Sequence, residues 1–598
     1  MGIFGSLYVG ASGLQTSQNA LNTVAHNMTN VDTEGYTRQQ VRQSTRFYNT
    51  ISKSASANAY QQVGLGVKFA EVAQVRDYFL DKSYRREHGR EGFYNISCDA
   101  IEEVEEIFQE LDGEAFADTL KNIWESVEEI AKDPSNTVNQ GVLVQRCNEF
   151  INRSRLVYDD LATYQDDLNF DVKQKTDRIN EIGRRIDEVN QAILKIEAGE
   201  VEHANDLNDE RNRLVDELSE IANITLDTDV DGNYLIQIEG VDFVNVGSVK
   251  ELEIYTDPVT GFYTPYWKML AKYDADGNPT ADANGNIIGR VFNMDREISS
   301  DMNTDIGSLK GLLLARGDRR TTFADMKADP SDYPPGATQA EKDALDAKAY
   351  AKIKDSVVMN VMAEFDKLVN QVTTGINSVL YEAALFGNGC IKEDLPDGTY
   401  QIRSKDGSAT YTKDPDTGKW LDGGGNEPSF DADGYLVDPA TGKPYTMFNM
   451  TDDSADGPGF TTTNVKINET LRKAPSLLGF IRPDGKADHE FIGDALKSVF
   501  ASEIYTLNPD VRTTTNLTNY YNNLISQVSN TGYVMRGISA NQTITVTNIR
   551  SAREEILGVS SDEELSNMIQ FQNAFNASSR YVNAINEMIE HILTTLGR

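Results

Sequence analysis

Histidines are the first candidates for metal binding or acid–base chemistry, and the 598-residue chain has five: His26, His88, His203, His489 and His591. None belongs to an HExxH or HxH spacing, which a zinc hydrolase would use to hold its metal. The glycines form neither a GxxxxGK[ST] phosphate-binding loop nor a GxSxG nucleophile turn. The sequence therefore predicts no catalytic residue, no metal ligand and no cofactor, and we expect that the protein is not an enzyme.

An acidic run, Asp227, Asp229 and Asp231 followed by Gly232, is the best candidate for a metal site because it opens like an EF-hand loop. Its twelfth position is Ile238 instead of Glu, and the YLIQI that follows alternates like a strand, whereas an EF-hand needs a helix there. Turns favour Asp and Gly without any metal. We therefore interpret this run as a β-turn.

Composition narrows the classes of partner. The chain has 56 Lys+Arg against 93 Asp+Glu, a net charge of −37, which repels nucleic acids and anionic lipid. No window approaches 18 apolar residues, and the first residues lack the basic start and apolar core of a cleaved signal peptide. Cys98, Cys147 and Cys390 are too few and too scattered for a disulfide framework. We expect neither nucleic acid nor membrane as a partner.

Both ends of the chain carry apolar residues at seven-residue spacing, which is typical of a helix with a narrow apolar seam. Two such seams are most simply buried against each other or against neighbouring copies. We therefore expect an assembly interface at these positions: Leu7, Leu14, Leu21 and Met28 near the N-terminus, and Met568, Phe575, Val582, Ile589 and Leu596 near the C-terminus.

Between the ends, helical and strand-like patterns alternate. A heptad pattern from Tyr158 to Ile196 predicts a long helix after a break at Pro134, and further helices are expected over 358–380 and 516–557. DG and NG dipeptides between short alternating runs predict hairpins in 225–300 and 390–515. Residues 321–350 are expected to form a loop.

The fold class that follows is multidomain α+β: a discontinuous α-helical coiled-coil rod, built from both termini, with two inserted β-rich domains. The expected division is a terminal coiled-coil layer (1–45 and 558–598), a helical rod domain (46–223, 350–385 and 516–557), an inserted β-rich domain with a loop (224–349) and a second inserted β-rich domain (386–515).

The two ends carry a recognisable motif. ASGLQTSQNALNTVAHNMTNVDTEGYTRQ, residues 11–39, resembles the N-terminal motif of bacterial flagellar axial proteins, which comprise rod, hook and hook-associated subunits. Its parts are a small-residue turn at Ser12-Gly13-Leu14, a helix, and NxANxxTxGY, with His26 where Asn is usual and Glu34 where Pro is frequent. GVSSDEELSNMIQFQNAFNASSRYVNAINEMIEHIL resembles the matching C-terminal helix, with Ser561 and Glu564 placed for a capping box.

Four interior stretches are similar to the branch of this family that forms the hook–filament junction, the FlgK-type hook-associated proteins. They are ANDLNDERNRLVDELSEIANI (204–224), SLKGLLLARGD (308–318), VGLGVKFAEVAQVRDYFLDKSYRRE (63–87) and the helix over 358–380. The resemblance implies a structural subunit that assembles by coiled-coil pairing of its terminal helices. It also implies type III export to the flagellum, with hook protein, a second junction protein and copies of itself as partners, and an export chaperone at the C-terminal helix region.

Three alternatives remain open on the sequence. The chain could be the hook protein or another axial subunit, which shares the terminal motifs. It could be a surface adhesin or enzyme with its activity in 386–515. A cytoplasmic coiled-coil scaffold would account for the 158–196 helix but not for the two matched ends.

Overall fold

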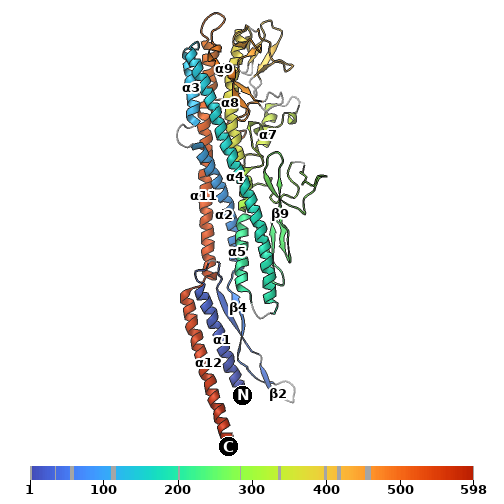
Figure 1. The fold of residues 1–598 in the computed structure, drawn as a ribbon, viewed down its shortest axis with the longest axis vertical. Helices are drawn as coiled ribbons and strands as arrows, with labels where there is room; N and C mark the ends of the chain where they lie inside the picture. Colours follow the sequence, from blue (N-terminus) through green and yellow to red (C-terminus); the bar gives the residue numbers. More distant parts are fainter. Residues whose placement is uncertain are drawn as a thin grey trace.

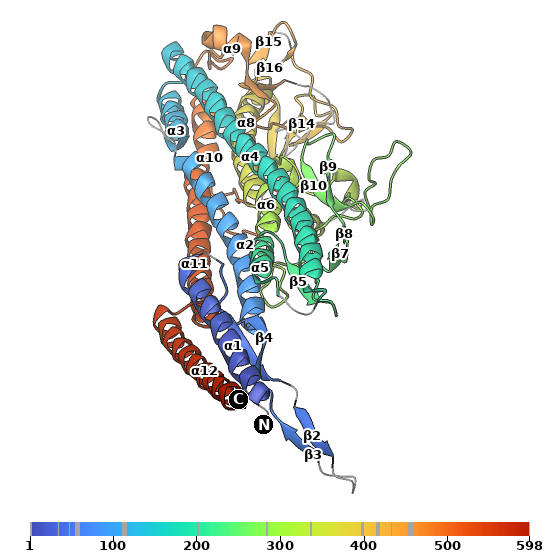
Figure 2. The same ribbon diagram turned by 60° about the horizontal axis from the view of Figure 1, so that its bottom comes forward.

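The molecule is a long rod with both chain termini near one end (Figure 1). This computed structural model describes residues 3–596, leaving out 34, 47, 54–59, 110–115, 200–202, 283–284, 335–337, 396–399, 414–418, 432 and 452–458. At that end, α1 (Ile3–Thr29) and α12 (Ser561–Leu596) lie side by side, and the other helices continue the rod beyond them (Figures 1 and 2).

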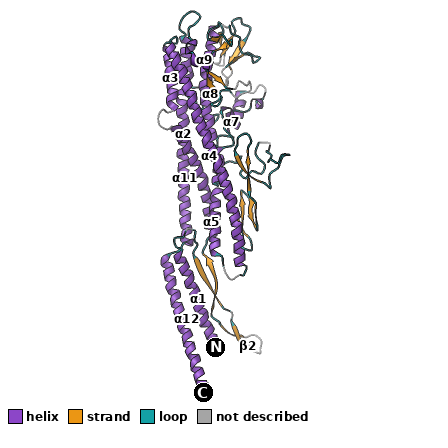
Figure 3. Cartoon of the chain, in the orientation of Figure 1, coloured by secondary structure: helices purple, strands orange, loops and turns teal. Residues whose placement is uncertain are grey.

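The body of the rod is a bundle of long helices that run along its axis, with the strands gathered on one side (Figure 3). Its helices are α2 (Tyr78–Gln109), α3 (Phe116–Lys132), α4 (Thr137–Glu197), α5 (Asn205–Ile221), α6 (Ser308–Arg316), α8 (Val357–Gly387) and α11 (Leu517–Leu557). The helices expected over 358–380 and 516–557 are confirmed by α8 and α11.

The heptad pattern of α4 is confirmed as the seam by which this helix packs. Val172, Ile179, Ile186 and Ile193 are all buried. The break at Pro134 is also confirmed, since α3 ends at Lys132 and α4 begins at Thr137. Asn136 caps the new helix by accepting a hydrogen bond from the backbone N–H of Val138.

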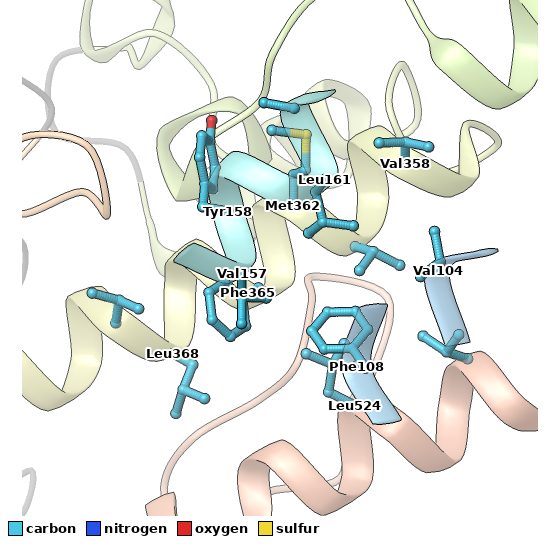
Figure 4. Close-up of a cluster of buried hydrophobic side chains, with 14 of the residues drawn as sticks. Val104, Phe108, Val157, Tyr158, Leu161, Val358, Met362, Phe365, Leu368 and Leu524 are labelled. Atoms are coloured by element: carbon cyan, nitrogen blue, oxygen red, sulfur yellow. The ribbon is translucent and has the colours of Figure 1, made fainter. Parts of the chain in front are cut away.

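The core of the body joins helices that are far apart in the sequence. Phe108 of α2, Phe365 of α8 and Leu524 of α11 point toward one another beside Val157 and Leu161 of α4 (Figure 4). Each of these helices contributes one apolar face to the core. The core is therefore complete only when α11, from the C-terminal part of the chain, packs with α2 and α4 from the N-terminal part.

Two groups of antiparallel strands are inserted between the helices, as the turn dipeptides predict. The first contains β5 (Ile224–Thr228), β6 (Tyr234–Ile238), β7 (Val241–Asn245) and β8 (Ser248–Val249) in that order, and the pair β9 (Leu252–Thr256) and β10 (Tyr263–Trp267). The second contains β11 (Ile391–Asp394), β12 (Tyr400–Arg403), β13 (Thr410–Lys413) and β14 (Trp420–Leu421), then the pairs β15 (Val437–Asp438) with β16 (Lys443–Pro444), and β17 (Phe448–Met450) with β18 (Val465–Ile467).

Two interior stretches differ from the sequence-based expectation. The loop expected over 321–350 contains α7 (Gln339–Tyr350), because Thr338 and Glu341 form a capping box that starts a helix there. After Ile467 the described residues form mainly short helices, with isolated antiparallel bridges at Ile481–Ala487 and Tyr505–Thr515, since Leu471, Leu496 and Phe500 are buried in the core of the body. These helices are α9 (Glu469–Lys473), a 3-10 turn (Pro475–Leu477), a π-helical turn (His489–Asp494) and α10 (Ala495–Ala501).

A small β-structure accompanies the terminal helices. β1 (Gln39–Thr45) pairs with β4 (Val67–Gln74), and β2 (Asn49–Lys53) pairs with β3 (Tyr60–Val63). β4 packs on α1 and leads into α2, so it connects the terminal helices to the body. Among the described helices, none is both long and apolar enough to cross a bilayer.

Candidate functional site

The interface between α1 and α12 is built on small residues of α1. Gly10, Ser17, Ala20, Val24 and Asn27 are buried and lie along one face, with a seven-residue step after Gly10 and then steps of three, four and three residues. Such steps place side chains on a single stripe of a helix. This stripe lies beside the leucine row that the sequence analysis selected.

The glycines of α1 allow the two helices to approach closely. A methyl group on Gly10 would lie 2.6 Å from Cγ2 of Val582, and one on Gly13 would lie 2.6 Å from Oγ of Ser578. Ser12-Gly13-Leu14 therefore lies inside α1, and the expected turn at these residues is wrong. The lack of a side chain at position 13 provides room for α12 and does not serve to reverse the chain.

The predicted interface residues are only partly covered. Leu7, Leu14, Leu21 and Met28 are each half-buried, and so are their counterparts on α12: Met568, Phe575, Val582 and Ile589. The side chain of Leu596 lies outside the described residues. Among the described residues of α12, only Glu564 and Ile585 are buried. One chain by itself therefore leaves most of the α12 surface open to solvent.

Asn27 is the centre of the joint between α1, α12 and the β-structure. Its Oδ1 accepts hydrogen bonds from the hydroxyl of Tyr36 (2.7 Å) and the N–H of Gln39 (3.1 Å). Its Nδ2 donates to the carbonyl of Gln39 (2.8 Å) and to the carboxylate of Glu564 (3.2 Å). The side chain is 1% exposed, so these bonds replace water completely.

Arg38 ties the start of α12 to the same joint. Its guanidinium lies 2.8 Å from Glu564 and 2.9 Å from Glu563, and its backbone N–H donates to the carbonyl of Leu557. Glu564 therefore bonds Asn27 and Arg38 and does not complete the expected capping box. Ser560 precedes the first residue of α12, and its Oγ accepts from the N–H of Glu563 at 3.5 Å.

A second group of charges connects the joint to the body. Arg76 donates to both carboxylate oxygens of Asp81, and Arg553 lies 2.7 Å from Asp81 and 2.7 Å from Asp216. Burial acts to raise the pKa of Asp81, but the hydrogen bonds from Arg76 and the charge of Arg553 outweigh it, so the pKa lies below its usual range. The Asp81 carboxylate is therefore charged at neutral pH and holds together α2, α11 and the segment that follows β4.

Two of the residues considered for chemistry, Asp229 and His26, have structural partners. Asp229 accepts hydrogen bonds from the N–H groups of Asp231 and Asn233, with Gly232 at φ +82°, which confirms the β-turn. His26 lies against Tyr36, with Nδ1 3.0 Å from the phenol oxygen. Among the described residues, no group of three or more His, Cys, Asp or Glu side chains is arranged to hold a metal ion.

Three family models match parts of the chain. The model for the flagella basal body rod protein matches residues 7–37, and that for the C-terminal region of flagellar basal body rod FlgEFG proteins matches residues 550–595. The helical domain of the flagellar hook-associated protein FlgK matches residues 101–332. The first two matches cover most of α1, nearly all of α12 and part of the joint between them.

Whole-chain relatives agree with these matches. Flagellar hook-associated protein 1 of Bacillus subtilis is 23% identical, with 99% of this chain and 98% of that protein covered. The proteins of the same name from Salmonella typhimurium and Escherichia coli are 22% and 20% identical, each with 97% of this chain and 98% of the relative covered. A solved structure, the flagellar hook junction protein FlgK from Burkholderia pseudomallei, aligns with a TM-score of 0.43 and 12% identity over 81% of this chain and 100% of that one.

The terminal matches make both ends of the chain similar to flagellar basal body rod proteins. Over nearly its whole length the chain is similar to flagellar hook-associated protein 1, and its residues 101–332 match the helical domain of FlgK.

Proposed function

We propose that this protein is a structural subunit of the bacterial flagellum that forms the junction between hook and filament. The observation that carries the proposal is the exposure of α12, a helix of 36 residues that buries only Glu564 and Ile585 among its described residues. A helix with so little burial gains most of its stability from neighbours. Neighbouring subunits in an axial assembly supply that burial.

The mechanism that we propose is coiled-coil pairing of the terminal helices, completed between copies. α1 and α12 already lie side by side, and their half-buried rows include Leu14 and Phe575. Complete burial of a Leu or Phe side chain contributes roughly 1.5–3 kcal/mol, so the rows together offset the cost of ordering both helices. The work of the subunit is mechanical, and no catalytic step is proposed.

The partners follow from the position at the junction. They are hook protein, a second junction protein and further copies of this chain, with an export chaperone at the C-terminal helix region before assembly. We propose that the protein is secreted through the flagellar export channel. The terminal layer (1–45 and 558–598) faces the axis, and the β-rich domains (224–349 and 386–515) lie outside the helical rod.

Immunogold labelling of purified flagella tests this position. An antibody against the isolated 386–515 segment should label only the boundary between hook and filament. Label along the whole hook would make the chain a hook subunit. A third outcome is that the antibody detects the protein in a bulk extract of the flagella but labels no part of the intact flagella. That outcome would favour an adhesin or an enzyme.

A further inference from the structure

The side of α11 that faces away from α2 forms a second seam. Gly537 comes nine positions after Val528, which is buried against the body, so at about 100° per residue Gly537 lies on the opposite side of the helix. The residues at three- and four-residue steps on that side are all exposed, and we call them the outer seam: Ser526, Asn530, Tyr533, Gly537, Ala540, Ile544, Thr547 and Ser551.

The outer seam lies on the least acidic part of the chain. Of 598 residues, 93 are acidic, yet the 43 residues from 511 to 553 contain no Asp or Glu. Two large apolar side chains stand in this neutral stripe, since Tyr533 is 76% exposed and Ile544 is 58% exposed. An uncharged helix side with exposed apolar residues is typical of a contact surface.

A hollow lies at the same height on another side of α11. It has a volume of about 540 Å³ and is bounded by α2, α6, α8 and α11. Thr531 and Met535 of its wall flank Tyr533 in the sequence, so the hollow and the Tyr533 side chain lie at one level of the rod. Its wall is mainly apolar, as at Phe93, Leu314 and Val361, and it also contains amide groups and the charged side chains of Glu297, Lys354 and Asp355.

We propose that a second copy of this chain docks against the outer seam, and that Tyr533 of one copy enters the hollow of the next. Charge is compatible with a copy as the occupant: two molecules of net charge −37 repel each other, and the outer seam adds no carboxylate to that repulsion. Continuity favours a copy, because three residues join α11 to α12, so a neighbour bound along α12 lies along α11. The inference therefore rests on the proposed function.

The contact is head-to-tail, because the outer seam and the hollow are on different sides of α11. A contact of this kind joins each copy to the next around a ring or helix and does not stop at a dimer. Tyrosine suits this contact, since its ring fills an apolar space while its hydroxyl bonds polar groups of the wall.

Cysteine cross-linking on purified flagella tests the contact. In a Cys390→Ser background, where the remaining Cys98 and Cys147 are buried, a chain with Tyr533→Cys and Leu314→Cys should give a ladder of dimers and larger species with a bismaleimide. Each single variant should remain monomeric. Leu314→Cys combined with Val230→Cys, at an exposed hairpin turn, is the matched control and should also remain monomeric.

A second measurement does not depend on the cysteine pair. Tyr533→Ala should leave thermal unfolding of the free chain unchanged and lower the amount of protein per flagellum several-fold, whereas Tyr273→Ala, at a half-exposed site, should not. Two results would overturn this inference and leave the proposed function intact. One is that the double-cysteine chain is incorporated into flagella but gives no ladder, and the other is that Tyr533→Ala is present in normal amounts per flagellum. Absence of the wild-type chain from flagella would overturn the proposed function together with this inference.

Discussion

At the scale of single residues, the terminal motif is explained by the bonds of Asn27. The motif pairs this residue with Tyr36, and in the structure its amide bonds the Tyr36 hydroxyl, both backbone groups of Gln39, and Glu564 of the opposite end. The sequence shows the motif but not this purpose, because the partner in α12 is 537 residues away. Pattern analysis detects local spacing and has no access to such pairings.

Replacing Asn27 with Ala leaves buried donors and acceptors without partners, which costs about 2 kcal/mol. We expect faster hydrogen exchange in residues 36–39 of the free chain and little change in the body. Asn22→Ala, on an exposed site of the same helix, is the matched control and should exchange like wild type. Equal exchange in both variants would show that Asn27 does not hold the joint.

The buried carboxyl group of Asp366 should make the free energy of unfolding depend on pH. Burial raises its pKa to about 6 although Thr462 and Phe323 donate hydrogen bonds to it. The folded chain thus keeps a proton that the unfolded chain releases near pH 4, so stability falls as pH rises from about 4 to about 6, by about 3 kcal/mol. Urea unfolding at pH 4 and pH 7 should show this loss relative to Asp366→Asn. Parallel pH profiles for the two chains would contradict it.

At the scale of elements, the sequence predicts which segments are helices better than it predicts which faces pack. The seven-residue rows identify α1, α4 and α12 because a heptad search detects large apolar residues. In α1 the most buried stripe consists instead of Gly10, Ser17 and Ala20, beside the leucine row. Small residues carry little hydropathy signal, so only the approach of α12 reveals their role.

Gly10→Ala tests that close approach. The added methyl group would lie 2.6 Å from Cγ2 of Val582, and overpacking of this kind typically costs 1–3 kcal/mol. We expect faster hydrogen exchange in α1 around position 10. Gly141→Ala in α4 is the control, because a methyl group there meets nothing within 4 Å and improves helix propensity, so exchange in α4 should slow or stay constant. Slower exchange around position 10 in Gly10→Ala would contradict the tight contact.

At the scale of the whole molecule, the rod has two parts: a body that has its own core, and terminal helices that remain largely exposed. The body has its own core, formed by α2, α4, α8 and α11, whereas the terminal helices keep half-buried rows and an exposed surface. The sequence predicts this division because the heptads stand at both ends. It does not predict the helical segment after Ile467, whose apolar residues are positioned by contacts with the body.

Phe575→Asp should therefore separate assembly from folding. A carboxylate in the half-buried row of α12 opposes its burial between neighbours, so we expect no incorporation into flagella. The body contains none of this row, and its thermal unfolding should match wild type. Gln572→Asp places the same charge at an exposed position of α12 and should assemble. Normal incorporation of Phe575→Asp would show that the row is not an interface.

The most direct test of the account is hydrogen exchange of α12 in the free chain and in purified flagella. If neighbours supply the burial that one chain lacks, residues 570–595 exchange rapidly in the free chain and slowly after assembly, while α4 is protected in both. Equal protection of α12 in the two states would contradict the claim that assembly completes the terminal helices.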